Sequence, residues 1–273
     1  MSVRTIPKNM ITVCQHEPHL SVFFQRQGNV LFTEETTLEG LSPDMTRYAQ
    51  DQCEYLTTRS VEDLVLLYMY TTGVYRVLNT YIRTGTILDE QHDAFFFAWC
   101  SVQFQQDRYA TASYDTMFQV FRGERVTSSL LDHYVRILNR IMHESPVLPF
   151  ELTVSRGTKA EIEQTGFIST SLHKDISSSM FAGKECCVYR MHLPQGTHAL
   201  FMLAVSYHPH EYEYLLPTGG VFQVTTQVRK PLPSEYEPDR TMMYISVTLI
   251  EQRYESDLER YYREMEEFRT QHW

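Results

Sequence analysis

Two kinds of periodicity divide this chain, and their order constrains the fold more than any other feature of the sequence. Apolar residues recur at helical spacing between residues 60 and 145, whereas residues 150–251 carry β-branched and aromatic runs separated by turn residues. Alternating βαβ units would mix the two patterns along the whole chain. We therefore expect an α+β fold with a helical first half and a strand-rich second half.

The helical half contains two segments with recognisable ends. The first follows Ser60-Val-Glu-Asp63, which is similar to a capping box, and a break is expected near Gly73. The second begins after Thr127-Ser128 and ends at Ser145-Pro146, because a residue before proline disfavours the helical conformation. Apolar residues at helical spacing support both segments: Leu64, Leu67, Tyr68, Tyr75, Leu78 and Ile82 in the first, and Leu131, Val135, Leu138 and Met142 in the second.

The second half is expected to supply strands, whereas the two ends of the chain show other patterns. The expected strands are Phe150–Ser155, Cys187–Leu193, Ala199–Ser206, Gly220–Gln227 and Met242–Glu251. Residues 1–58 mix short β-like runs with turn residues, and we assign them no role. Residues 254–268 predict an amphipathic helix, which either packs on the domain or binds a partner. The predicted division is a segment at 1–58, a domain at 59–252 with a helical part at 59–148 and a β core at 149–252, and a C-terminal helix within 253–273.

Composition and motif content exclude several classes of function. The net charge of −10 argues against a nucleic-acid partner, whereas an acidic cleft attracts cationic protein side chains. The sequence has neither a GxGxxG segment after a strand nor a P-loop lysine motif, which disfavours a Rossmann dehydrogenase and a P-loop NTPase. Five scattered cysteines without a CxxC pair indicate neither a disulfide framework nor structural zinc. Without a signal-like or membrane-spanning apolar run, we expect no membrane insertion and a cytoplasmic site of action.

Three short motifs follow one another in the strand-rich half. They are Leu152-Thr-Val-Ser-Arg156-Gly157, Gly166-Phe-Ile-Ser169-Thr170-Ser171 and Glu211-Tyr-Glu213-Tyr-Leu-Leu-Pro217. Taken alone, the first is weak evidence and the second is typical of solvated strand ends. The third is more telling, because strand alternation would place Glu211 and Glu213 on one face, where two like charges repel. In isolation, a solvated edge strand explains that pair equally well.

In this order, the motifs resemble those of the arginine–serine–glutamate class of mono-ADP-ribosyltransferases, which includes actin-modifying toxins, C3-like exoenzymes and vertebrate ecto-enzymes. The resemblance covers about residues 60–230 and includes the helical segment with Tyr75, Asn79 and Arg83. It implies a helical half packed on an antiparallel β core of two sheets. It also implies NAD as substrate. Because Glu211 stands two residues before Glu213, it implies a protein arginine as acceptor.

The resemblance also assigns roles to individual residues. It implies that Glu213 stabilises the positive charge that develops on the ribose, that Ser169 holds Glu213, and that Glu211 handles the guanidinium and takes its proton. Arg156 offers a planar fork to the pyrophosphate or the adjoining ribose, and Phe181 stacks on nicotinamide. The catalytic candidates are therefore Arg156, Ser169, Glu211 and Glu213; the NAD-binding candidates are Arg156, Gly157, Ser169, Thr170, Ser171, Phe181 and Glu213; and no metal is expected.

Several alternatives stay open at this point. Water as acceptor would make the protein an NAD glycohydrolase, and an inactive domain would only bind a protein, although the joint presence of the catalytic candidates argues against the latter. Arg122 also precedes a glycine, but it lies between helical patterns, whereas Arg156 ends a β-like run and is favoured. Tyr207 and His208 are candidates for contact with the target protein. His208 and His210 match no standard metal-site spacing, so exposed loop histidines are the preferred explanation.

Overall fold

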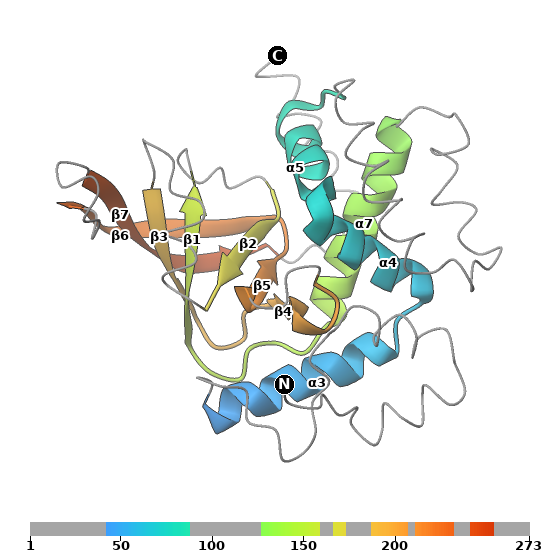
Figure 1. Ribbon diagram of the computed structural model, residues 1–273, viewed down its shortest axis with the longest axis horizontal. Helices are drawn as coiled ribbons and strands as arrows, with labels where there is room; N and C mark the ends of the chain where they lie inside the picture. The colour runs from blue at the N-terminus through green and yellow to red at the C-terminus, as the bar shows by residue number, and fades with distance from the viewer. Residues whose placement is uncertain are drawn as a thin grey trace, which may run out of the picture. The chain divides into compact units, whose positions relative to one another are not determined.

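The computed structural model describes six stretches of the chain: residues 42–87, 127–158, 166–172, 187–206, 211–231 and 241–253. The chain divides into two compact units. The first comprises Met1–Pro146, Met202–Pro209 and Glu255–Trp273, and the second comprises Val147–Phe201 and His210–Tyr254. The described α-helices belong to the first unit and the described strands to the second (Figure 1).

The helices of the first unit begin at side-chain caps. Helix α3 (Pro43–Thr57) is capped by Ser42, α4 (Val61–Met69) by Ser60 and α7 (Ser128–Glu144) by Thr127; each hydroxyl accepts a hydrogen bond from the backbone N–H three residues ahead. The caps at Ser60 and Thr127 confirm two of the helix starts that the sequence predicts. Helix α3 was not predicted, because its apolar pattern is interrupted by polar residues.

A break between two helices occurs where the sequence predicts it. Helix α4 continues into a π-helical turn (Tyr70–Val74) and then into α5 (Tyr75–Thr84). Within that turn Gly73 has a φ of 146°, a backbone conformation that residues with a side chain rarely adopt. Glycine therefore allows the chain to change direction between α4 and α5. Helix α5 ends at Thr84 and is followed by Gly85, whose left-handed conformation (φ 67°) is common just after a helix.

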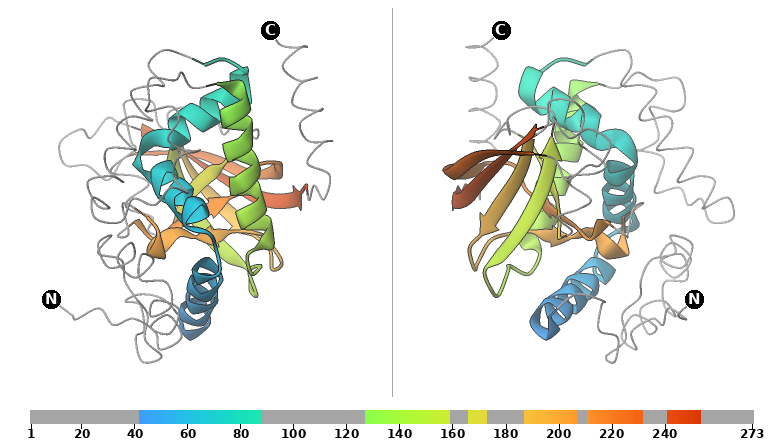
Figure 2. Two further views of the ribbon diagram at one scale, coloured as in Figure 1. Left: turned by 90° about the vertical axis from the view of Figure 1, so that its right-hand side faces the viewer. Right: turned by 60° about the vertical axis from the view of Figure 1, so that its left-hand side comes forward.

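Helix α7 lies against α4 and α5 and carries the buried face that the sequence predicts (Figure 2). Its four stripe residues, Leu131, Val135, Leu138 and Met142, have no exposed surface. Each buried aliphatic side chain of this size contributes about 1.5–3 kcal/mol to folding. The helix ends at Glu144, and the next residue, Ser145, is extended, as expected for a residue before Pro146.

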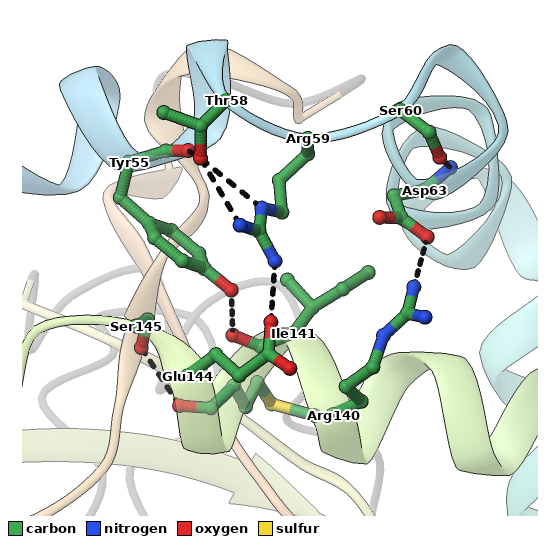
Figure 3. Close-up of polar contacts among 10 residues, drawn as sticks. Tyr55, Thr58, Arg59, Ser60, Asp63, Arg140, Ile141, Glu144 and Ser145 are labelled. Carbon is green, nitrogen blue, oxygen red and sulfur yellow. Dashed lines mark hydrogen bonds and ion pairs between the residues drawn. The ribbon is translucent and has the colours of Figure 1, made fainter.

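Polar contacts tie α7 to α3 and α4 within the first unit (Figure 3). Arg140 on α7 donates to the buried carboxylate of Asp63 on α4 over 2.6 Å. Closer to the end of α7, Glu144 pairs with Arg59, which follows α3. The Tyr55 hydroxyl donates to the carbonyl of Ile141 over 2.6 Å. These contacts fix the register of α7 against the preceding helices.

The second unit contains one sheet of seven strands (Figure 1). Along the chain the strands are β1 (Leu152–Thr158), β2 (Ile168–Ser171), β3 (Cys187–Leu193), β4 (Leu200–Phe201), β5 (Glu213–Leu216), β6 (Gly220–Pro231) and β7 (Thr241–Gln252). In space their order is β4-β5-β2-β1-β3-β7-β6. Strands β2, β1 and β5, which carry the three motifs, are therefore neighbours.

The sheet corrects one expectation about its architecture and does not confirm another. An antiparallel core was expected, but β3 and β7 are parallel, so the sheet is mixed. Antiparallel strands can be joined by a short hairpin, whereas this parallel pair is separated by three intervening strands in the sequence. The expected division into two sheets is not seen among the described strands, which all belong to one hydrogen-bonded sheet.

The predicted strand boundaries are right in some places and wrong in others. The prediction matches β3 and comes within one residue of both ends of β7. The expected strand Ala199–Ser206 is wrong beyond β4, because the chain turns into a short 3-10 helix (Met202–Ala204). The early β-like runs and the helix expected at 254–268 lie outside the described residues. In the part of the chain that the structure describes, no helix combines the length and apolarity that a bilayer span requires.

Candidate active site

The three sequence motifs meet on adjacent strands of the second unit. Strand β2, with the Ser-Thr-Ser run, pairs on one side with β1, which carries Arg156, and on the other with β5, which begins at Glu213. Ser171 lies opposite Ser155 in the first pair and opposite Glu213 in the second. The sheet thus brings together residues that are up to 57 positions apart in the sequence, from Arg156 to Glu213.

Ser169 and Glu213 form the centre of this site. The Ser169 hydroxyl donates a hydrogen bond to Oε1 of Glu213 over 2.5 Å. Glu213 is buried, with 7% of its surface exposed. A carboxylate at such a position needs a donor, because burial without a partner penalises the charged form. Ser169 supplies that donor from the neighbouring strand.

The surroundings of Glu213 change its acidity. The pKa of the Glu213 carboxyl is raised from its ordinary value of 4.5 to about 7, chiefly because burial disfavours the charged form. The hydrogen bond from Ser169 lowers this pKa, the charge of Glu211 raises it, and the charge of Arg156 lowers it. A carboxyl group that titrates near neutrality in a polar cluster is typical of functional sites.

Arg156 is held beside the same serine. Its Nη1 donates to the backbone carbonyl of Ser169 over 2.7 Å, and its side chain is half-buried. This contact orients the guanidinium next to the Ser169–Glu213 pair. Gly157, the next residue on β1, is also half-buried and lies opposite Val188 of β3. The competing Arg122 lies outside the described residues.

The geometry of Glu211 differs from the expected one. Strand β5 begins at Glu213, and Tyr212 has a φ of 47°, so Glu211 lies before the strand. The expectation that strand alternation places Glu211 and Glu213 on one face is therefore wrong, because alternation requires extended backbone between them. The two carboxylates interact all the same, since the charge of Glu211 raises the pKa of Glu213.

The other two residues of the Ser-Thr-Ser run bond to the backbone of the Glu-x-Glu segment. The Thr170 hydroxyl donates to the carbonyl of Tyr214 over 2.8 Å, and the Ser171 hydroxyl donates to the carbonyl of Glu211 over 2.6 Å. Both hydroxyls thus stabilise the backbone of the adjacent Glu-x-Glu segment. The sequence gives no signal for the left-handed Tyr212, because such positions usually carry glycine or asparagine. Phe181, Tyr207, His208 and His210 lie outside the described residues.

Comparison with known proteins identifies the family. The model of the ADP-ribosyltransferase exoenzyme family matches residues 107–251, which is more than half of the 273-residue chain and includes all three motifs. Comparison with curated proteins found no match.

Solved structures with a similar fold come from the same group of proteins. Plx2a, an ADP-ribosyltransferase toxin from Paenibacillus larvae, is 14% identical with a TM-score of 0.51, over 76% of this chain and 95% of the toxin. BECa, an ADP-ribosylating toxin of a binary enterotoxin of C. perfringens whose structure contains NADH, is 14% identical with a TM-score of 0.53. That match covers 76% of this chain and 48% of BECa, so this chain spans about half of BECa's length. The chain belongs to the ADP-ribosyltransferase exoenzyme family, whose members use NAD as substrate.

Proposed function

We propose that this protein transfers the ADP-ribose of NAD to an arginine side chain of a target protein. The observation that carries the proposal is the hydrogen bond from Ser169 to the buried Glu213, made beside Arg156 and two residues after a second glutamate, Glu211. The family supplies NAD as the substrate. The choice of arginine rests on Glu211.

The proposed reaction breaks the bond between the ribose C1′ and the nicotinamide nitrogen. The bonding electron pair leaves with nicotinamide, and positive charge develops on the ribose ring. The Glu213 carboxylate stabilises that charge, and it does so effectively because the protein fixes it before the reaction. Ser169 holds the carboxylate through its hydrogen bond. Removing one fixed charge or donor of this kind typically raises the barrier by about 3–4 kcal/mol.

Arg156 suits the anionic part of NAD. A guanidinium binds pyrophosphate oxygens through parallel hydrogen bonds that the point charge of a lysine cannot reproduce. The bond to the Ser169 carbonyl limits the rotation of the Arg156 side chain. We assign Gly157 and the backbone of the Ser-Thr-Ser strand to the same NAD-binding wall, because the Thr170 and Ser171 hydroxyls donate to carbonyls of the Glu-x-Glu segment. We assign Phe181 to stacking on the nicotinamide ring.

The acceptor requires a second carboxylate. A guanidinium is protonated in water and is a poor nucleophile. In the proposed step a guanidinium nitrogen forms the new bond to C1′ while its proton passes to the Glu211 carboxylate. Glu211 is half-buried, so a guanidinium can reach it from solvent. The overall charge of −10 also favours the approach of cationic side chains.

Two products separate transfer from NAD hydrolysis. The protein is incubated with NAD labelled on adenosine and with agmatine, a small guanidine, and ADP-ribosyl-agmatine and free ADP-ribose are quantified by mass spectrometry. We expect the agmatine adduct to dominate. Free ADP-ribose alone would make the protein a glycohydrolase. The absence of both products would indicate an inactive, protein-binding domain.

Variants of the two glutamates test the division of roles. Glu213→Gln should lower both products by at least a hundredfold, since the charge next to the ribose is lost. Glu211→Gln should lower the agmatine adduct by a similar factor while hydrolysis falls less than threefold. An equal loss of both products in Glu211→Gln would assign Glu211 to NAD instead of the acceptor. Incubation with a cell lysate, followed by mapping of modified peptides, identifies the target residue.

A further inference from the structure

The backbone between the two glutamates adopts a conformation that ordinary residues avoid. Among the described residues other than glycine, Tyr212 is the one with a positive φ, at 47°. For a residue with a side chain this left-handed conformation is unfavourable, and it persists only where surrounding contacts impose it. Contacts from neighbouring residues must therefore hold the segment from Glu211 to Glu213 in this shape.

Two hydrogen bonds from one end of β2 hold this segment. The Ser171 hydroxyl donates to the carbonyl of Glu211 over 2.6 Å, and the N–H of Leu172 donates to the carbonyl of Tyr212 over 3.3 Å. The first fixes the peptide unit before the Tyr212 Cα, and the second fixes the one after it. Both peptide planes around the left-handed residue are thereby constrained.

A ring contact supports the same segment. The ring of Tyr212 lies 6.5 Å from that of Phe201, and the Phe201 ring lies 4.8 Å from that of Tyr214, centroid to centroid. Phe201 is buried, with 1% of its surface exposed. Tilted aromatic pairs at such distances are favourable, so the contact anchors the Tyr212 side chain to the sheet.

The two glutamates depend on different supports. Glu213 is the first residue of β5, so the strand pairing with β2 and the bond from Ser169 fix its position. Glu211 lies outside the strand, so no ladder fixes it. Its carbonyl is instead held by Ser171, through the turn at Tyr212.

We propose that Ser171 and the left-handed backbone of Tyr212 are positioning elements that set Glu211 toward the acceptor guanidinium and so control the ratio of transfer to hydrolysis. The proposal rests on the proposed function. In both reactions the C1′–N bond breaks and its electron pair leaves with nicotinamide. In transfer the guanidinium nitrogen bonds to C1′ and loses its proton to Glu211, whereas in hydrolysis water bonds to C1′ and its proton passes to solvent. A displaced Glu211 impairs the first route more than the second.

A set of hydroxyl variants tests the role of Ser171. Agmatine modification and NAD hydrolysis are measured with the full-length protein, together with the thermal midpoint. Ser171→Ala should lower the transfer-to-hydrolysis ratio about tenfold, which corresponds to the loss of one hydrogen bond. Ser171→Thr keeps the donor and should restore the ratio to within threefold of wild type. The matched control is Thr197→Ala, which removes a hydroxyl that donates to the Pro194 carbonyl over 2.7 Å elsewhere in the same unit, and should leave the ratio unchanged.

A second pair of variants tests the backbone of Tyr212 separately from its ring. Tyr212→Asn and Tyr212→Val both remove the ring contact with Phe201, but asparagine tolerates the left-handed region and a β-branched residue does not. We expect Tyr212→Val to lower the ratio at least fivefold more than Tyr212→Asn. Equal ratios in the two variants would overturn the role of the backbone conformation.

Failure of this inference is distinguishable from failure of the proposed function. If Glu213→Gln loses both activities and Ser171→Ala keeps the wild-type ratio, the site stands and the positioning role is wrong. If Ser171→Ala lowers both activities in proportion, Ser171 acts on NAD and the inference is also wrong. If Glu213→Gln keeps both activities, the proposed function itself fails.

Discussion

The Ser169 hydroxyl lies 2.5 Å from Oε1 of Glu213, and this contact joins the middle of β2 to the first residue of β5. It gives a buried carboxylate its donor and also opposes the effect of burial on the pKa of Glu213. Burial and the hydrogen bond from Ser169 therefore act on the ionisation of Glu213 in opposite directions. Ionised Glu213 is needed for the proposed chemistry, but the fold itself favours the protonated form.

The rate of NAD cleavage should depend on the ionisation of Glu213. Because the pKa of this carboxyl in the folded protein is about 7, a substantial fraction of the free enzyme is protonated at neutral pH. We expect kcat/KM for NAD to rise with pH through about 7 and then to level off. A pH–rate profile for NAD hydrolysis measures this, and a rate independent of pH between 5 and 8 would contradict the role of Glu213.

The same titration should affect stability with a defined sign. The pKa of Glu213 is higher in the folded than in the unfolded chain, so ionisation destabilises the fold as pH rises from about 4.5 to 7. A pKa shift of this size corresponds to a change in the free energy of unfolding on the order of 3 kcal/mol. Glu213→Gln should thus raise the free energy of unfolding at pH 8, with a smaller gain at pH 5. Urea denaturation at both pH values gives the comparison, and a variant less stable than wild type at pH 8 would contradict it.

Removing the Ser169 hydroxyl should move the pH dependence in a known direction. The hydrogen bond lowers the pKa of Glu213, so in Ser169→Ala this pKa rises and the acid limb of the pH–rate profile moves to higher pH. A hydrogen bond to a charged group is worth about 1.5–3 kcal/mol, so activity at pH 6.5 should fall at least tenfold.

The control for this experiment is again Thr197→Ala, whose profile should coincide with that of wild type. If Ser169→Ala lowers activity by one factor at all pH values, Ser169 supports NAD binding without changing the ionisation of Glu213.

The ion pair between Asp63 and Arg140 should contribute more to stability than the more exposed pair of Arg59 and Glu144. The side chain of Asp63 is 7% exposed, whereas that of Glu144 is 49% exposed. Arg140→Met leaves the buried carboxylate without this donor and should cost about 1–3 kcal/mol. Glu144→Gln should cost less than about 1 kcal/mol, as for surface pairs in general. Urea denaturation of the two variants tests the ranking, and equal losses would contradict it.

Local signals explain which parts of the fold the sequence predicts well. The ends of α7 and the break at Gly73 follow from three local signals: the capping hydroxyl of Thr127 bonds to the first turn, and proline and glycine act through their own backbone. Local signals do not predict which strands pair with each other. The parallel contact of β3 with β7 joins segments about 55 residues apart, and the periodicity of each strand carries no information about its neighbour.

In the candidate site, too, local sequence predicts some features whereas contacts with distant residues determine others. The residue types of Arg156, Ser169 and Glu213 are recognisable as motifs, and the sheet places them together. The conformation of Tyr212 is not recognisable, because contacts from β2 and not the local sequence impose it. The hydrogen bond from Ser171 could only be found from the structure.

Two Arg-Gly pairs precede the Ser-Thr-Ser run, at Arg122 and at Arg156, and we expect Arg156 to be the arginine that serves NAD. Arg156 lies on β1 and its guanidinium donates to the Ser169 carbonyl over 2.7 Å. A lysine at this position presents a point charge and cannot make the parallel hydrogen bonds that a guanidinium makes to phosphate oxygens. Arg156→Lys should raise the KM for NAD and lower kcat/KM at least tenfold, whereas Arg122→Lys should stay within threefold of wild type. Both variants keep the charge, so a difference between them reports the geometry of the fork. NAD-turnover assays that give the reverse pattern would place the first motif at Arg122 and would leave Arg156 with a role in the sheet alone.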